Sequence, residues 1–217
     1  MSTRKNLVLF TVLVFILTFS ITSIACAQST EAIKQTIKLP EPQKTGGVPT
    51  LEAIENRASA VSAQFPTGEI SQKELSTLLW AASGRNRSDN GWTVPTAMGL
   101  DPYVSIYIAS KDGMFLYNGK EHTLERLSDG DKRTQVTPQS FAHPAPYILI
   151  FVINGKSNGA TFGQALAGAM TQNVYLTSQS LNIGARFMAT MNQDFVRKEL
   201  KLADDDVTVN IMPLGKR

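Results

Sequence analysis

The 217-residue sequence has few of the side chains that most enzymes use for catalysis. It contains one cysteine, Cys26, and two histidines, His122 and His143, which lie in unrelated contexts. A serine hydrolase triad would need one of these histidines, yet the chain has no Gly-x-Ser-x-Gly motif to present a nucleophilic serine. His122 is expected in an exposed strand, and no group of His, Cys or carboxylate residues has the spacing of a metal site. Neither a hydrolytic triad nor a metal centre is therefore predicted.

The N-terminus has the pattern of an export signal. Arg4 and Lys5 precede an apolar run at 7–24, and the small residues around Cys26 form a cleavage site that ends at Ala27. The run is close to the length of a membrane span, so an uncleaved anchor remains an alternative, as does lipidation of Cys26. We expect an exported protein, either periplasmic or anchored at the outer face of the cytoplasmic membrane.

Cleavage after Ala27 would change the composition in two ways. The mature chain would have no thiol, which excludes disulfides, thiolate catalysis and cysteine metal sites. Its formal net charge would fall from +3 to +1, because Arg4 and Lys5 are lost with no acidic residue. A near-neutral chain gives no electrostatic reason to expect nucleic acid as a partner.

We divide the chain into a signal peptide or anchor at 1–27, an extended linker or arm at 28–49, and one domain at 50–217. Helices are predicted at 51–65, after Ser71 in a Ser-x-x-Glu capping box, at about 161–182, and after Asn192. Strands are predicted at 103–110, 114–118, 121–128, 147–153 and 207–215. The mixed order of helices and strands predicts a single α+β domain.

One possible nucleotide motif is rejected. Gly155, Lys156 and Ser157 follow a predicted buried strand, as in a phosphate-binding loop. That motif needs a glycine five residues before Gly155, where this chain has Ile150.

Four distant segments carry groups suited to an aromatic, phosphorylated ligand. Arg57 and Ser59 could bind a phosphate, and residues 215–217 add two cations. The turn at 94–99 has small residues that let the backbone approach a flat ring, and the segment after Gly184 could pass under that ring. Each signal has a simpler interpretation, because a lone arginine is usually a surface charge and a C-terminal Lys-Arg is usually part of a frayed tail.

In their order and spacing these segments resemble the nitroreductase family of FMN flavoproteins, in particular its short exported or thiazole/oxazole-dehydrogenase-like branch. The resemblance runs from about residue 39 to 217 and includes "LEAIENRASAV", "VPTAMGLDP", "QNVYLTSQSLNIGA" and "MPLGK". It implies a central, mostly antiparallel sheet flanked by helices, a homodimer, and FMN as cofactor. The residues that match the family's flavin-binding positions are Arg57, Ala58, Ser59, Val61, Pro95, Thr96, Ala97, Gly99, Phe187, Met188, Ala189, Lys216 and Arg217.

Three of these positions depart from the family pattern. Ala58 stands at one of the two basic positions that are lost from the family's Arg-Arg-Ser-x-Arg cluster. Val61 stands where the family has a basic residue, and Gly99 stands where a Pro-Ser-x-x-Asn turn has asparagine. Phe187, Met188 and Ala189 match the segment that faces the flavin's redox edge.

The resemblance also implies a role for the helix at about 161–182, which would lie in the core of the dimer. Its small residues Ala165, Ala167, Gly168 and Ala169 would allow close helix approach. The amides of Gln172 and Asn173 would then be satisfied across the interface or near the cofactor; the simpler reading is that they face solvent or cap neighbouring backbone.

The implied function is a ping-pong oxidoreductase, in which the flavin accepts electrons and passes them to a small organic acceptor. Because export would separate the protein from cytoplasmic NADH and NADPH, we expect the electrons to come from a membrane carrier or redox-protein partner. The alternative is an exported binding module that keeps the fold but has a degenerate flavin site.

Overall fold

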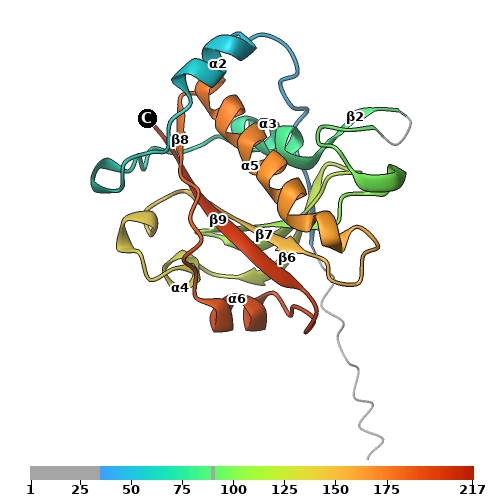
Figure 1. Cartoon of the computed structure of the whole chain (residues 1–217). Coiled ribbons are helices and arrows are strands. Elements are labelled where there is room, and N and C mark those ends of the chain that lie inside the picture. Colours follow the sequence, from blue (N-terminus) through green and yellow to red (C-terminus); the bar gives the residue numbers. More distant parts are fainter. Residues whose placement is uncertain (1–34, 89–90) are drawn as a thin grey trace, which may run out of the picture. The chain divides into compact units, whose positions relative to one another are not determined.

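The computed structural model describes residues 35–88 and 91–217, and its centre is a seven-stranded sheet (Figure 1). The strand order is β1-β6-β5-β4-β7-β9-β8, and every neighbouring pair is antiparallel. The strands are β1 (Thr36–Lys38), β4 (Val104–Ser110), β5 (Gly113–Asn118), β6 (Thr123–Asp129), β7 (Tyr147–Ile153), β8 (Ile183–Ala185) and β9 (Val207–Lys216). A separate small ribbon pairs β2 (Arg85–Arg87) with β3 (Gly91–Trp92).

Helices cover the sheet in two groups (Figure 1). The helices α2 (Thr50–Asn56), α3 (Gln72–Ser83) and α5 (Gly163–Ser180) lie together, and α3 and α5 pack on one face of the sheet. The short helices α4 (Arg133–Val136) and α6 (Gln193–Glu199) lie on the other side with a second, smaller core. Both faces of the sheet are therefore buried, and the α+β class predicted from the sequence is confirmed.

The central strand β7 explains this two-sided architecture. Its residues Ile148 to Ile153 are all buried, so the run "YILIFVI" supplies side chains to both cores. A strand covered on both faces reads as a continuous apolar run because successive side chains point to opposite faces.

Local signals fix several element boundaries as predicted. Ser71 and Glu74 form the expected capping box at the start of α3, and the Asn192 side chain accepts a hydrogen bond from the Phe195 amide at the start of α6. The hairpin between β4 and β5 closes where Ser110 pairs with Gly113. Gly113 has φ +146°, a value that L side chains rarely adopt, which accounts for glycine at this turn.

The first helix is shorter than predicted. We expected it to run from 51 to 65, but α2 ends at Asn56 and Arg57 is already extended, with φ −60° and ψ 118°. The reason is tertiary: the Ala60 amide donates to the carbonyl of Ala185 at 2.9 Å, so this segment pairs with the end of β8. Only a short 3₁₀ turn at Ser62–Gln64 follows.

The arm before the domain takes part in the sheet. Residues 36–38 form β1, which pairs with β6, and Leu39 is buried in the main core. Residues 1–34, which include the predicted signal peptide and Cys26, lie outside the described residues. Within the described part of the chain, no helix is long and apolar enough to cross a membrane.

His122 does not lie in an exposed strand, contrary to the prediction. It sits in the left-handed region with φ 54°, just before β6, and is half-buried. Its Nε2 lies 2.7 Å from Ser76 Oγ, and its Nδ1 lies 2.9 Å from the Tyr117 hydroxyl. Because Ser76 has no exposed surface, this serine–histidine contact is structural and offers no accessible nucleophile.

Candidate flavin site

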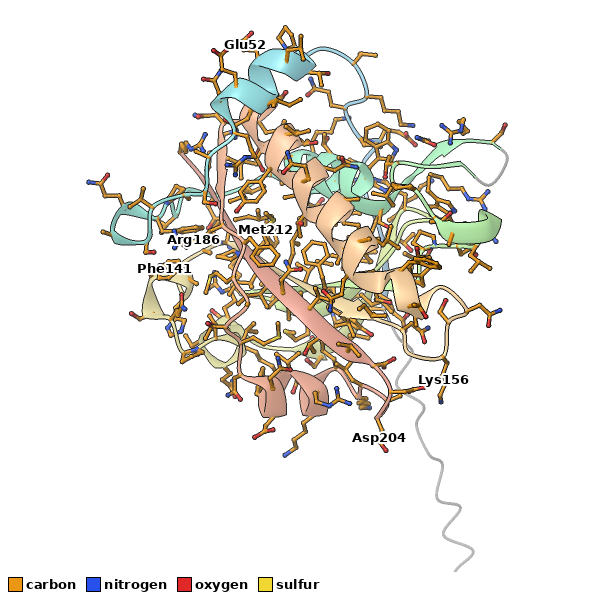
Figure 2. The ribbon with its side chains drawn as sticks, in the orientation of Figure 1. Glu52, Phe141, Lys156, Arg186, Asp204 and Met212 are labelled. Atoms are coloured by element: carbon orange, nitrogen blue, oxygen red, sulfur yellow. The ribbon has the colours of Figure 1, made fainter. Side chains whose placement is uncertain are left out.

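The segment that matches the family's phosphate-binding residues lies against the end of β8. The Ala60 amide donates to the Ala185 carbonyl, and Arg186 Nη1 donates to the Ala60 carbonyl at 2.9 Å. Figure 2 shows Arg186 beside Phe141, and the guanidinium lies 5.6 Å from the centre of that ring. Contacts on both sides of Ala60 therefore fix the course of the chain through the predicted site.

Tyr175 of α5 joins two of the predicted segments. Its hydroxyl lies 2.8 Å from Ser59 Oγ and accepts a hydrogen bond from the Phe187 amide at 2.7 Å. The Arg57 guanidinium stacks over the Tyr175 ring at 5.1 Å from its centre. Residues 57–59 and Phe187, which are far apart in the sequence, thus meet at one buried tyrosine.

A cavity of about 390 Å³ opens beside this junction. Its lining contains Ser59, Val61 and Arg217 from the predicted set, with Ala60, Gln64 and Pro66. Among the described residues neither Arg57 nor Arg217 forms an ion pair, so both charges are available to an anion. Val61 is 64% exposed and adds an apolar wall where the family pattern has a cation.

Two glycines allow the wall of this cavity to lie close to the sheet. A β-carbon at Gly215 would overlap the carbonyl oxygen of Pro66, and one at Gly184 would overlap the ring of the same proline. The next residues continue the contact, because Gly68 and Lys216 exchange two backbone hydrogen bonds. The loop at 59–68 is therefore attached to the ends of β8 and β9 along its length.

Lys216 has a different partner from the one that the sequence suggested. Its ammonium binds the Glu74 carboxylate and the carbonyl of Leu181, and it does not line the cavity. Burial raises the pKa of Glu74, but hydrogen bonds from Lys216 and Ser71 outweigh that effect, so the pKa lies below its ordinary value. Of the two C-terminal cations predicted to reach a phosphate, only Arg217 lies at the cavity in this structure.

The predicted turn over the flavin ring lies on another side of α5. Asn173 donates to the carbonyls of Ala81 and Thr93, which fastens the start of that turn to α5. Tyr175, which binds Ser59, is two residues further along the helix, and side chains two apart point about 200° from each other. Within one copy of the chain, Thr96 and its neighbours therefore do not share the cavity with Ser59 and Arg217.

The turn itself has a defined shape. Pro95 and Gly99 are exposed, Thr96 precedes a 3₁₀ turn that spans Ala97–Gly99, and Gly99 has φ +68°. A β-carbon at Gly99 would have no neighbour within 4 Å, so its left-handed backbone, and not crowding, accounts for glycine here.

The side-chain amides of Gln172 and Asn173 in α5 find their surroundings within a single copy of the chain. Gln172 is exposed, and the Asn173 amide is satisfied by two carbonyls of its own chain. Ala167 is buried in the core, while Ala165 and Gly168 face outward. The Asn173 Nδ2 group therefore needs neither a partner subunit nor a cofactor for its hydrogen bonds.

The segment expected at the redox edge is split between core and surface. Met188 is buried and bridges to Ile211, whereas Ala189 is exposed and Phe187 is 45% exposed. Tyr175 and Arg186, which hold this segment and residue 60, were not predicted as site residues. Tyr175 is the first residue of "YLTSQSLNIGA" and Arg186 directly follows it, but no local pattern shows which distant backbone groups these two side chains bind.

Four other cavities in the described part of the chain are lined by none of the predicted flavin-binding residues. One cavity of about 340 Å³ lies between the start of β4 and the end of β5. Another, of about 500 Å³, is lined by residues 100–103 and by the loop that follows β7. No group of three or more potential metal ligands occurs in the described residues.

The comparisons with known proteins identify the family. The model of the nitroreductase family matches residues 55–216, so the chain belongs to that family. A proposed nitroreductase from Ralstonia eutropha JMP134 is 32% identical, with a TM-score of 0.75 over 84% of this chain and 90% of its own. No curated protein matches the chain.

Two more distant structures share the fold alone. A proposed nitroreductase from Anabaena variabilis ATCC 29413 is 17% identical, with a TM-score of 0.67; the match covers 85% of this chain and 42% of that one. The Escherichia coli microcin synthetase McbBCD complex, solved with truncated pro-MccB17 bound, is 14% identical, with a TM-score of 0.58; the match covers 92% of this chain and 84% of that one.

Family membership implies a flavin-dependent oxidoreductase, and the cavity residues fit one end of such a cofactor. An anionic phosphate needs positive charge and hydrogen-bond donors, and Arg217, Ser59 and the adjoining Arg57 offer both. Residues 95–99, which were expected over the ring, do not line this cavity.

Proposed function

We propose that this protein is an FMN-dependent oxidoreductase that works by a ping-pong mechanism on a small organic acceptor. The observation that carries the proposal is the cavity at Ser59, Val61 and Arg217. Its lining residues 59–66 lie within the part of the chain that matches the family model, and Arg217 directly follows that part. Bound FMN would supply the chemistry by accepting a hydride or electrons and passing them on. The chain has two histidines and one cysteine, and on this proposal no side chain acts as a general acid or a nucleophile.

The protein's own residues would hold and orient the cofactor. Arg57 and Arg217 would neutralise the phosphate, and the Ser59 hydroxyl would donate to it. Phe187 and Met188 would place backbone near the ring. Val61 and Gly99 would contribute shape only, so we expect weaker FMN binding than in relatives with a basic residue and an asparagine there.

The active form, on this proposal, is a homodimer. Residues 57–61 and 95–99 lie on different sides of α5, so only a second copy can bring both to one ring. The outward face of α5 carries Ala165 and Gly168, which would let a partner helix approach closely.

The neighbouring surface also fits an interface. Leu51 and Ile54 of α2 are 81% and 51% exposed, and Val61 and Phe187 are exposed beside the cavity. Exposed large apolar side chains on adjoining segments are typical of contact surfaces. Light scattering on the purified protein tests this: a dimeric mass is expected, and a monomer that binds FMN would contradict it.

We further propose that the protein is exported and receives electrons from a membrane carrier or redox protein. The support is the pattern of residues 1–27, since NADH and NADPH are cytoplasmic. Rapid, saturable reduction of the purified protein by NADPH would contradict this part of the proposal.

The competing function is an exported binding module without redox activity. Val61 and Gly99, in place of residues that bind flavin in the family, favour it. A visible spectrum of protein purified from its native compartment separates the two: a yellow preparation with a flavin band is expected, and a colourless one that cannot be loaded with FMN would favour the module.

A further inference from the structure

Tyr175 lies at the centre of a chain of hydrogen bonds that leads into the cavity. The side chain is 6% exposed and its hydroxyl contacts Ser59 Oγ at 2.8 Å and the Phe187 amide at 2.7 Å. Ser59 itself is exposed and lines the cavity. The chain therefore connects a backbone amide of the segment at 187–189 to a hydroxyl at the cavity surface.

The directions of these hydrogen bonds follow from the donors available. The Phe187 amide can only donate, so the Tyr175 oxygen is its acceptor. The Tyr175 proton needs an acceptor because the group is buried, and Ser59 Oγ is the acceptor within reach among the described residues. With its oxygen accepting from Tyr175, Ser59 keeps its own proton free to donate into the cavity.

We propose that Tyr175 is a positioning residue that aims the Ser59 hydroxyl at an anionic group in the cavity and couples this contact to Phe187. The proposal rests on the proposed function, in which the anion is the phosphate of FMN. A run of aligned hydrogen bonds strengthens each member, so an anion on Ser59 would also tighten the bond to the Phe187 amide. Phosphate binding would then help to order the segment expected beside the ring.

The inference predicts how the protein distinguishes FMN from riboflavin, which has the same ring system without the phosphate. Tyr175→Phe removes the hydroxyl but keeps the ring that stacks under Arg57. We expect the dissociation constant for FMN to rise about tenfold, because a hydrogen bond to a charged group loses its alignment. The constant for riboflavin should change by less than about twofold.

A double-mutant cycle with Ser59→Ala separates this coupling from a general loss of structure. Both variants interrupt the same chain, so the double variant should bind FMN no more than about twofold more weakly than Ser59→Ala alone. Tyr117→Phe is the matched control, because it also removes a buried hydroxyl with a hydrogen bond, to His122, away from the cavity. It should bind FMN as the wild type does.

A second measurement uses the protein without flavin. Amide hydrogen exchange at Phe187 should be faster in Tyr175→Phe than in the wild type or in Tyr117→Phe, and added inorganic phosphate should slow it only where Tyr175 is intact. Additive losses in the cycle, equal losses for FMN and riboflavin, or unchanged exchange at Phe187 would each overturn the inference. A wild type that binds no FMN would instead overturn the proposed function, and the exchange measurement would still decide the role of Tyr175.

Discussion

The contact between Glu74 and Lys216 allows a graded test of what holds α3 to the end of β9. The Glu74 carboxylate accepts from Ser71 in the capping box and from the Lys216 ammonium. Glutamine at position 74 keeps the capping function, since that motif accepts Glu or Gln, but removes the charge. Alanine removes both, so the two variants separate the ion pair from the cap.

The expected magnitudes follow from burial. The side chains of Glu74 and Lys216 are 20% and 33% exposed, so solvent screens the pair only in part. We expect Glu74→Gln to lower the free energy of unfolding by about 1 kcal/mol, at the lower end for a hydrogen bond between charged groups. Glu74→Ala should cost about 2 kcal/mol, because a lost N-terminal cap adds roughly 1 kcal/mol.

The pH dependence of this difference has a defined sign. The pKa of Glu74 is lowered in the folded protein, so its contribution is complete above the unfolded value of 4.5 and is lost as the pH falls through the folded value. The gap between wild type and Glu74→Gln should be constant from about pH 6 to 8 and close in acid.

Urea unfolding followed by circular dichroism measures these values, with Glu69→Gln as the control. Glu69 makes only a 4.0 Å pair with Lys111, and both side chains are largely exposed, so its loss should cost less than about 0.5 kcal/mol. Equal stability of Glu74→Gln and the wild type at pH 7, or a gap that widens in acid, would refute the reasoning.

Three further outcomes are expected. Asn210→Leu should raise the free energy of unfolding by about 1 kcal/mol, because both side-chain polar atoms of this fully buried residue lack a partner among the described residues. Burial lowers the pKa of His122 below 6.5, and this effect outweighs the hydrogen bond to the Pro40 carbonyl, which raises it. Because protonation of His122 then favours the unfolded chain, the free energy of unfolding should fall as the pH drops from 7 to 5. His122→Gln should make this pH dependence weaker in urea unfolding. Gly215→Ala should lower the thermal midpoint by several degrees, since its β-carbon would overlap the Pro66 carbonyl oxygen.

Each of these expectations has a contrary result. A less stable Asn210→Leu would mean that the amide has partners that the described contacts do not include. An unchanged slope in His122→Gln would assign the acid sensitivity to other groups. If Gly215→Ala leaves the midpoint unchanged, close approach of Pro66 is not what requires glycine at 215.

The elements read correctly from the sequence are those set by neighbouring residues. The apolar run at 147–153 suited a fully buried strand, and Ser71 with Glu74 marks a helix start through groups three residues apart. Asn192 marks another in the same way. The α+β class and the family resemblance depend on such signals, and the structure and the family model confirm them.

The errors occur where a distant contact overrides a local preference. The sequence at 57–65 favours helix, but pairing of Ala60 with Ala185 holds it extended. His122 reads as an exposed strand residue, yet Ser76 and Tyr117 enclose it. Ala185 and Ser76 are too far along the chain from the residues that they contact for any periodic pattern to indicate them.

By itself, the sequence predicted the main helices, the long strands, the α+β class and the family resemblance, because periodicity, caps and turns act over a few residues. It did not predict the short strands β1, β2, β3 and β8 or the short helix α4. Only the tertiary structure decided which charges face the cavity. Arg217 lines the cavity and Lys216, one residue earlier, binds Glu74 instead. Successive residues of a strand point in opposite directions, so what each one meets depends on the elements packed on either side of the sheet.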